Sequence, residues 1–348
     1  MNNRYDEEVM TAITPRERVS TAIRHVQPDR TPYQISFTTP ARRKLADYYG
    51  RADLDDLVGN HLAKYRARPP DALSWLADRP GFFRDEFGVV WNRTIDRDIG
   101  MVERYPLAER SLAGFTFPDP LNPLRFAALP AFIEANPGRF RYVSMSYSLF
   151  ERAWSLRGME ALLMDMLEAP TFVDDLFDAL LAFSLAMIDE FVKYDIDGIL
   201  FGEDWGQQRG LIFSPKLWRR FIKPRIAQMY AATRQAGKTV LIHSCGKVQE
   251  LFPELIDLGL DVFNPFQPDV MDPYEMKALY GDRLAFYGGV SVQQLLPHGT
   301  PQMVRDEVRR LMDVVGRDGG FIISPSHDMP GDIPVENMVA LIETVREG

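Results

Sequence analysis

The stretch that decides the fold is Lys238-Thr239-Val240-Leu241-Ile242-His243-Ser244-Cys245-Gly246, a short apolar run that ends in a His and in the only Cys of the 348-residue chain. In an extended strand, residues i and i+2 point to the same face, so we expect the imidazole of His243 and the thiol of Cys245 to lie side by side where the strand ends. Helical periodicity precedes the run in residues 215–235 and follows it in residues 248–258. A strand between two helices is typical of a repeated βα architecture.

The same alternation of short apolar runs and helical segments extends along the chain from about residue 140. The predicted strands are residues 141–147, 198–203, 240–245, 261–264, 284–287 and 321–324. The predicted helices between them are residues 171–194, 215–235, 248–258, 273–279 and 301–315. Pro215 after Ser214 and Pro301 after Thr300 have the polar cap followed by proline that is typical of a helix start.

Earlier segments complete this pattern. Residues 30–37 are predicted as a first strand and residues 85–91 as a second, and a helix opens at Thr14. Roughly eight parallel strands with intervening helices indicate an α/β fold of the (β/α)8 TIM-barrel class, with the surplus in an N-terminal helical extension and in a Pro-rich insertion at residues 95–137. A doubly wound open sheet is the alternative, but no Gly-rich phosphate-binding turn follows an early strand. No linker divides the chain, so residues 1–348 are predicted to form one domain.

The composition disfavours several classes of protein. A 46% share of hydrophobic residues with 26% charged residues is that of an ordinary globular protein, and a single Cys excludes an intramolecular disulfide. The start of the chain lacks the apolar core of a secretory signal, so we expect a cytoplasmic protein. No apolar run approaches the ~20 residues that cross a bilayer. A net charge of −9 with no concentrated basic face disfavours nucleic acid as a partner.

This acidity also bears on the substrate. It argues mildly against a ligand with many carboxylates, although a local basic pocket stays compatible with the net charge. The expected partner is a small molecule. The sequence leaves the oligomeric state open, a homodimer included.

Polar residues stand at the carboxyl ends of several predicted strands, where TIM barrels carry their working residues. His243 and Cys245 end one strand, and His327 follows the last one. Together they predict a metal site, and imidazole with thiolate favours zinc over magnesium or calcium. Alone, each residue also has a structural explanation, such as a buried Cys beside a satisfied His or a loop His that bonds to backbone.

Other residues near strand ends are assigned to catalysis or to substrate binding. Glu203 and Asp204 follow an apolar run and are candidates for a fourth metal ligand or for a general acid or base. Helix capping or pairing with an Arg is the structural alternative for both. The predicted substrate-binding residues are Tyr147, Glu151, Arg152, Gln267 and Asp328.

A series of short motifs occurs in a specific order along the chain. They are Thr14-Pro-Arg-Glu-Arg18, Pro28-Asp-Arg-Thr-Pro32, Tyr105-Pro-Leu107, Phe117-Pro-Asp-Pro120, Phe150-Glu-Arg-Ala153, Asp204-Trp-Gly206, His243-Ser-Cys-Gly246, Asn264-Pro265, Gly288-Gly289 and Pro334-Val-Glu-Asn337. In this order the chain resembles the uroporphyrinogen decarboxylase superfamily over nearly its whole length, and within it the branch of zinc-dependent, corrinoid-linked methyltransferases. The resemblance implies a TIM barrel, in agreement with the strand pattern.

Individual positions separate the two activities of this superfamily. Its decarboxylases carry an Arg-rich run after the first strand that holds the substrate's carboxylates, and this run is missing from residues 34–43 of the present chain. The decarboxylases also have a Tyr at the third strand, and Arg152 stands in its place here. The thiol methyltransferases use a His-x-Cys pair as zinc ligands, and His243 and Cys245 match it. Their third ligand is a Cys, whereas the corresponding residue here is His327. The resemblance therefore implies a zinc site of two His and one Cys, open to a substrate oxygen as well as to a sulfur.

The function that this resemblance implies is a zinc-dependent methyltransferase, which moves a methyl group between a small thiol or methoxy substrate and a corrinoid. Nothing like the corrinoid-binding signature Asp-x-His-x-x-Gly occurs in the sequence, so the corrinoid is expected on a separate partner protein. A metal-free decarboxylase of a porphyrinogen-like or other carboxylated substrate is one alternative. A non-catalytic binding protein on the same barrel is the other.

Overall fold

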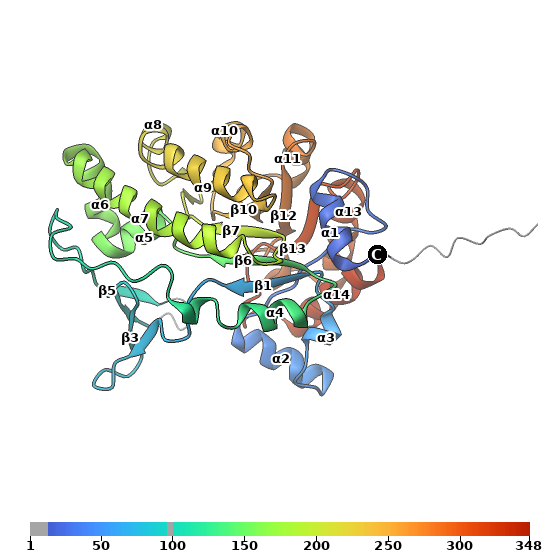
Figure 1. The fold of residues 1–348 in the computed structure, drawn as a ribbon. Coiled ribbons are helices and arrows are strands. Elements are labelled where there is room, and N and C mark those ends of the chain that lie inside the picture. The colour runs from blue at the N-terminus through green and yellow to red at the C-terminus, as the bar shows by residue number, and fades with distance from the viewer. Residues whose placement is uncertain (1–12, 96–99) are drawn as a thin grey trace, which may run out of the picture.

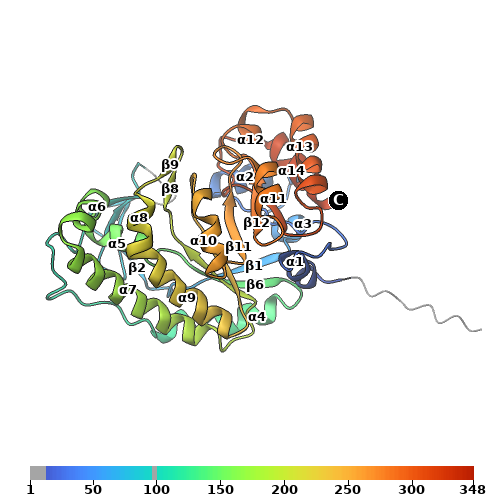
Figure 2. The same ribbon diagram turned by 90° about the horizontal axis from the view of Figure 1, so that it is seen from above.

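A computed structural model describes residues 13–95 and 100–348 of the chain. Its centre is a sheet of parallel strands that curls into a barrel with helices around the outside (Figures 1 and 2). In sheet order the seven strands are β1 (Leu62–Arg66), β6 (Phe140–Met145), β7 (Gly198–Gly202), β10 (Thr239–His243), β11 (Val262–Phe266), β12 (Ala285–Val290) and β13 (Phe321–Pro325). The predicted TIM-barrel class is confirmed.

The two edge strands of this sheet, β1 and β13, are joined by the segment predicted as the first strand. The backbone amide of Gln34 donates to the carbonyl of Ile323 (3.0 Å), and the amide of Ile323 donates to the carbonyl of Pro32 (2.9 Å). On the other side, the amide of His61 donates to the carbonyl of Tyr33 (3.2 Å). The segment is irregular and forms isolated bridges, but it occupies the place of an eighth strand.

Helices follow the strands and cover the outer face of the barrel (Figure 2). The α-helices are α1 (Pro15–Ile23), α2 (Thr39–Tyr49), α3 (Asp55–Val58), α4 (Leu129–Ala135), α5 (Phe150–Arg157), α6 (Met159–Glu168), α7 (Pro170–Phe191), α8 (Pro215–Leu217), α9 (Lys223–Gln235), α10 (Phe252–Asp257), α11 (Pro273–Tyr280), α12 (Leu295–His298), α13 (Pro301–Val314) and α14 (Val335–Glu347). Shorter helical turns are η1 (Pro123–Arg125), η2 (Trp218–Ile222) and η3 (Gln249–Leu251). Among the described residues, no helix combines the length and the apolar character that a membrane span requires.

The alternation of side chains along β10 explains how this strand positions its terminal His. Val240 and Ile242 are fully buried in the large core between the sheet and the helices. Leu241 belongs instead to a smaller apolar cluster inside the barrel, with Leu62 of β1. Because residues two apart share a face, His243 points the same way as Leu241, into the mouth of the barrel.

The prediction of a barrel strand at residues 85–91 is wrong. A separate antiparallel sheet contains the strands β2 (Leu73–Trp75), β3 (Phe82–Asp85), β4 (Val90–Asn92) and β5 (Met101–Arg104). Residues 85–91 run from the end of β3 through a turn into β4. The side chain of Asp85 accepts hydrogen bonds from the amides of Phe87 and Val89 (both 3.0 Å), and Gly88 has a positive φ of 83°. This turn reverses the chain, which no barrel strand does.

The antiparallel sheet belongs to a long connection between β1 and β6. The connection also contains η1 and α4, so it is larger than the insertion predicted at residues 95–137, of which residues 96–99 lie outside the described part. In Figure 1 this sheet stands beside the barrel, next to α5. A second small hairpin, β8 (Gly206–Gln207) with β9 (Gly210–Leu211), follows β7.

Candidate functional site

Three side chains that are far apart in the sequence meet at the carboxyl ends of β10 and β13. His243 is the last residue of β10, Cys245 lies two residues further on, and His327 follows β13. Each offers one ligand atom, and these atoms all lie within 4.8 Å of one another. The Sγ atom of Cys245 is 3.4 Å from Nε2 of His243. The predicted ligands are therefore brought together, and we call them the His/Cys cluster.

The ring of His243 is oriented by a residue of the neighbouring strand β11. Asn264 donates its amide Nδ2–H to the carbonyl of Tyr287 (3.0 Å), which turns its Oδ1 toward His243. That oxygen is 2.7 Å from Nδ1 of His243 and can only accept, so Nδ1 carries the proton. The lone pair of Nε2 then faces Cys245, as a metal ligand requires. Burial lowers the pKa of His243 and so favours the neutral ring, although the charge of Asp204 opposes this.

Backbone contacts fix the position of the Cys245 thiol. The amide of Cys245 donates to Oδ1 of Asp204 (2.8 Å), and the amide of Gly246 donates to Oε1 of Gln267 (2.6 Å). Gly246 has a φ of 86°, and a Cβ there would clash with the backbone of Gly206. Burial raises the pKa of the Cys245 thiol, and the charges of Asp204 and Glu151 reinforce this. A metal cation at the cluster would offset both the burial and the negative charges, because it lowers the pKa of the thiol.

The donor set of the His/Cys cluster fits zinc. Two imidazoles and one thiol are ligands that zinc prefers, and three protein ligands with an open fourth position are typical of catalytic zinc. Asp204 lies close to this group, with its Oδ1 4.0 Å from Nε2 of His243. That oxygen already accepts the Cys245 amide, so Asp204 both shapes the loop and adds negative charge beside the cluster.

Glu203 is placed differently from the other predicted catalytic residue, Asp204. Its side chain is fully buried, and its carboxylate accepts from Oγ of Ser148 (2.9 Å) and from the amide of Phe150 (2.8 Å) at the start of α5. Burial raises the pKa of Glu203 to about 8 in spite of these donors. Glu203 thus ties the loop after β6 to the end of β7 and is not a member of the His/Cys cluster.

A second carboxyl group stands near Asp204. Burial and the negative charges of Asp204 and Glu203 raise the pKa of Glu151 well above its ordinary value. Its Oε2 accepts a hydrogen bond from the amide of Tyr147 (3.3 Å), whose φ of 57° is uncommon for a residue other than glycine. The raised pKa and the neighbouring carboxyl group make Glu151 a candidate general acid.

Asp328 lies on the opposite side of the mouth. Burial acts to raise its pKa, but a hydrogen bond from Ser36 and the charges of Lys64, His327 and Arg66 hold that pKa below its ordinary value. An ionised Asp328 thus lies beside a cluster ligand and near two cations of β1. Its predicted contact with substrate, like that of Gln267, stays a prediction.

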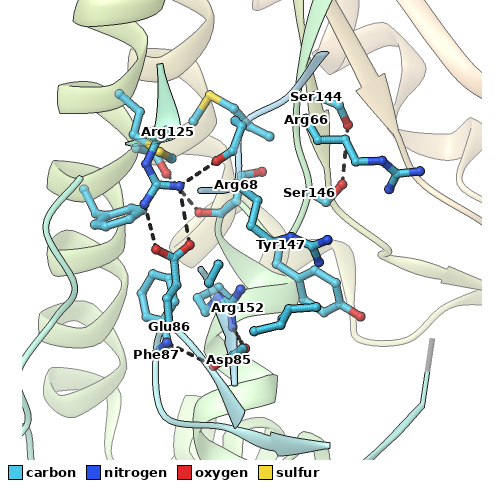
Figure 3. Close-up of a pocket in the computed structure, with 18 of the residues that line it drawn as sticks. Arg66, Arg68, Asp85, Glu86, Phe87, Arg125, Ser144, Ser146, Tyr147 and Arg152 are labelled. Carbon is cyan, nitrogen blue, oxygen red and sulfur yellow. Dashed lines mark hydrogen bonds and ion pairs between the residues drawn. The ribbon is translucent and has the colours of Figure 1, made fainter. Parts of the chain in front are cut away.

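A cavity of about 250 Å³ opens between the ends of β1 and β6 and the antiparallel sheet (Figure 3). Two of the predicted substrate-binding residues, Tyr147 and Arg152, line it. Its other cations, among them Arg66, Arg68 and Arg125, were not predicted from the sequence. The only signal for the first two is two arginines two residues apart, one ending β1 and one in the loop that follows. We call this cavity the arginine pocket.

The fold and the site together define a TIM-barrel protein whose candidate ligands and acids stand at the carboxyl ends of its strands. Comparison with known families makes this class specific. The profile of uroporphyrinogen decarboxylase (URO-D) matches residues 102–348. The chain belongs to the uroporphyrinogen decarboxylase family.

Its relatives are enzymes of two kinds. A methylated-thiol–coenzyme M methyltransferase of Methanosarcina mazei is 26% identical over 153 residues, which cover 43% of this chain and 38% of that protein. A uroporphyrinogen decarboxylase of Methylococcus capsulatus is 24% identical over 186 residues, which cover 52% of this chain and 50% of that protein. The chain thus spans half or less of these curated relatives.

A solved structure extends the similarity to the whole fold. A methyltransferase from Methanosarcina mazei superimposes with a TM-score of 0.74 at 18% identity, covering 96% of this chain and 99% of the other. At this identity the match concerns the fold. The predicted resemblance to the superfamily and to its methyltransferase-like branch is confirmed.

Proposed function

We propose that this protein is a zinc-dependent methyltransferase that moves a methyl group between a small thiol or methoxy substrate and a corrinoid carried by a separate protein. The observation that supports this most is the His/Cys cluster, in which His243, Cys245 and His327 offer three ligand atoms within 4.8 Å. The similarity to a methylated-thiol methyltransferase points to the same class of reaction.

When bound, zinc supplies Lewis acidity, which makes a thiol a better nucleophile or an ether oxygen a better leaving group. The chain's own residues prepare this chemistry. Asn264 fixes the tautomer of His243, so that Nε2 is available as a ligand. Glu151, whose pKa is raised by burial and by neighbouring carboxylates, is the candidate to give a proton to a substrate oxygen as the methyl group leaves, while Asp204 keeps the Cys245 loop in place.

The test combines metal analysis with a methyl-transfer assay. Zinc should copurify at about one equivalent, and the protein should exchange methyl groups between methylcobalamin and a panel of thiols and methoxy compounds. Cys245→Ala and His243→Ala should each lose both zinc and turnover. His298→Ala is the matched control, because His298 is exposed on α12 and should change neither.

Two results would contradict the proposal. Full zinc occupancy in both ligand variants would place any metal elsewhere. Turnover that is unchanged after complete removal of zinc would exclude a role for the metal in the reaction.

Decarboxylation of a small carboxylated substrate is the second candidate. The arginine pocket favours it, since Arg66 and Arg68 offer charges to a carboxylate, and decarboxylases are among the relatives. Release of CO2 from a carboxylated substrate by zinc-free protein, without corrinoid activity, would replace the first proposal by this one.

A further inference from the structure

The arginine pocket is strongly basic in a chain that is acidic as a whole. The chain has a formal net charge of −9. The described residues that line the pocket include five arginines and only two carboxylates, an excess of three positive charges. They are Arg66, Arg68, Arg93, Arg125, Arg152, Asp85 and Glu86. A concave site with such an imbalance attracts an anion.

Both carboxylates of the pocket are already paired. Arg125, which is almost fully buried, binds Glu86 through its Nη2 (2.7 Å), and Arg152 binds Asp85 through its Nη1 (2.7 Å; Figure 3). These two pairs hold the walls of the pocket together, and neither carboxylate makes an ion pair with Arg66 or Arg68. The acids of the pocket therefore do not neutralise it.

Arg66, the last residue of β1, and Arg68, two residues further on, both line this cavity with exposed side chains. In Figure 3 the side chain of Arg66 extends away from the Arg125–Glu86 pair, so its charge lies at the border between the pocket and the barrel mouth. Within residues 13–95 and 100–348, neither guanidinium group makes a hydrogen bond or a close ion pair, although the charge of Arg66 also acts on Asp328 of the mouth. Burial and the charges of Arg66 and Arg93 lower the pKa of Arg68, so the cations of the pocket repel one another. An anionic group between them would relieve this repulsion and accept their hydrogen bonds.

Aromatic rings form much of the remaining wall. Trp91 lies 5.6 Å from Tyr147 and 6.2 Å from Phe83 between ring centroids, and Phe87 lies 5.0 Å from Phe183. All five line the pocket. Rings in such positions favour a planar, apolar body over a flexible aliphatic one. The volume of about 250 Å³ is below the range of about 300–1,000 Å³ for drug-sized ligands, so the body is small.

The pocket adjoins the His/Cys cluster through the two carboxyl groups of the mouth. Tyr147, which lines the pocket, donates its amide proton to Glu151. The charge of Asp204 raises the pKa of Glu151, and Oδ1 of Asp204 lies 4.0 Å from Nε2 of His243. A ligand in the pocket thus lies on the side of the mouth that carries Glu151, Asp204 and His243.

We propose that the arginine pocket binds the substrate of the methyl transfer and that this substrate is a single aromatic ring that carries an anionic group. Arg66 and Arg68 bind the anion, and the aromatic wall packs against the ring. The inference rests on the proposed function for the identity of the reaction, but the binding itself depends on residues that are not members of the cluster.

The experiment titrates the purified protein with three probes by calorimetry. The probes are 4-methoxybenzoate, methoxybenzene, which lacks the anion, and methoxyacetate, which lacks the ring. 4-Methoxybenzoate should bind at least about tenfold more tightly than methoxybenzene, since a charge-assisted hydrogen bond contributes about that factor. It should also bind at least about tenfold more tightly than methoxyacetate, which has no ring to pack against the aromatic wall. Its dissociation constant should rise with salt concentration.

Variants locate the binding. Arg66→Gln and Arg68→Gln should each weaken 4-methoxybenzoate about tenfold and leave methoxybenzene unchanged. Arg84→Gln is the matched control, because Arg84 is exposed on the same antiparallel sheet but does not line the pocket. Thermal unfolding of each variant verifies that it is folded, and the salt dependence of the wild-type protein tests the anion without any substitution.

The outcomes separate this inference from the proposed function. Equal affinity for methoxybenzene would overturn the role of the anion, and equal affinity for methoxyacetate would overturn the role of the ring, whatever the zinc content. Binding of 4-methoxybenzoate that depends on Arg66 and Arg68 and survives removal of zinc would support the pocket even if no methyl transfer is found.

Discussion

The His/Cys cluster and the arginine pocket lie on the same barrel mouth but are built in different ways. The cluster comes from the ends of β10 and β13, which belong to regular βα units. The pocket comes from the ends of β1 and β6 and from the antiparallel sheet and η1, which interrupt the barrel between these two strands. Regular strands position one region, and an inserted segment positions the other.

This difference separates chemistry from specificity. The pleat and the register of parallel strands hold the cluster, so its geometry follows from the barrel itself. The pocket depends on two ion pairs: Arg152 of α5 with Asp85 attaches the inserted segment to the barrel, and Arg125 of η1 with Glu86 joins two parts of the inserted segment to each other. Connections of this kind vary more easily than strands, so we expect the pocket to determine the shape and charge of the substrate, and the cluster to determine only which substrate atom binds the metal.

The largest effect is expected at His327, where the cluster differs from the thiol methyltransferases. His327→Ala should weaken zinc binding by roughly a thousandfold, because it removes one of three protein ligands. His327→Cys should keep zinc bound and shift substrate preference toward thiols, because a thiolate replaces an imidazole at the same place. Metal analysis and competition with a chelator measure both. Zinc retained at full affinity in His327→Ala would show that the cluster does not use this residue.

A smaller effect is expected at the ion pair inside the inserted segment. Glu86→Gln should lower the free energy of unfolding by about 3 kcal/mol, because it leaves the charge of Arg125 buried without its partner. Glu103→Gln is the control, since the pair of Glu103 with Arg79 is exposed and should contribute less than about 1 kcal/mol. Urea unfolding measures the difference. Equal losses in the two variants would show that the ion pair does not hold the insertion in place.

The regular half of the barrel could be predicted from the sequence, and the interrupted half could not. From residue 140 onward the strands are buried on both faces and appear as continuous apolar runs. β1 has the sequence Leu-Ala-Lys-Tyr-Arg, in which Lys64 and Arg66 face the polar mouth, so no apolar run marks it. The apolar residues near Trp91 suggested a strand, whereas Asp85 and Gly88 form the turn that removes them from the barrel.

The same contrast applies to the site. The spacing of His243 and Cys245 at a strand end shows directly that both side chains share a face, and the barrel then brings His327 to them. The pocket combines residues of β1, the antiparallel sheet and η1, and its character depends on which arginines are paired. Pairing depends on distances in space, which no sequence pattern states. Asn264 was seen only as part of a motif, since its role depends on a contact across two strands.

An intermediate effect is expected at Asn264, which supports the cluster without belonging to it. Asn264→Ala removes the acceptor for Nδ1–H of His243 and should weaken zinc binding by about 10- to 100-fold. Asn264→Asp keeps an oxygen acceptor and should retain most of the affinity. Zinc competition assays on the two variants measure this. Equal loss in both would indicate that the contact with Tyr287, which both variants lose, is the one that matters.

The last effect depends on pH and concerns Glu203, which directly follows β7 and is fully buried. Its pKa is about 8 in the folded protein and near 4.5 in the unfolded chain, because burial disfavours the charged form. Between these values the folded protein holds a proton that the unfolded chain has lost, so the free energy of unfolding should fall as the pH rises from about 4.5 to about 8, by at most about 1.4 kcal/mol per pH unit. Below this window both states are protonated, and the contribution is fully present.

Glu203→Gln replaces the acid by a neutral group of the same shape and should flatten the slope, whereas Glu160→Gln on the exposed face of α6 should leave it unchanged. Urea unfolding between pH 5 and pH 8 gives the comparison, and an equal slope in Glu203→Gln would mean that the carboxyl is ionised in the folded protein and held by Ser148 and the start of α5 as an anion.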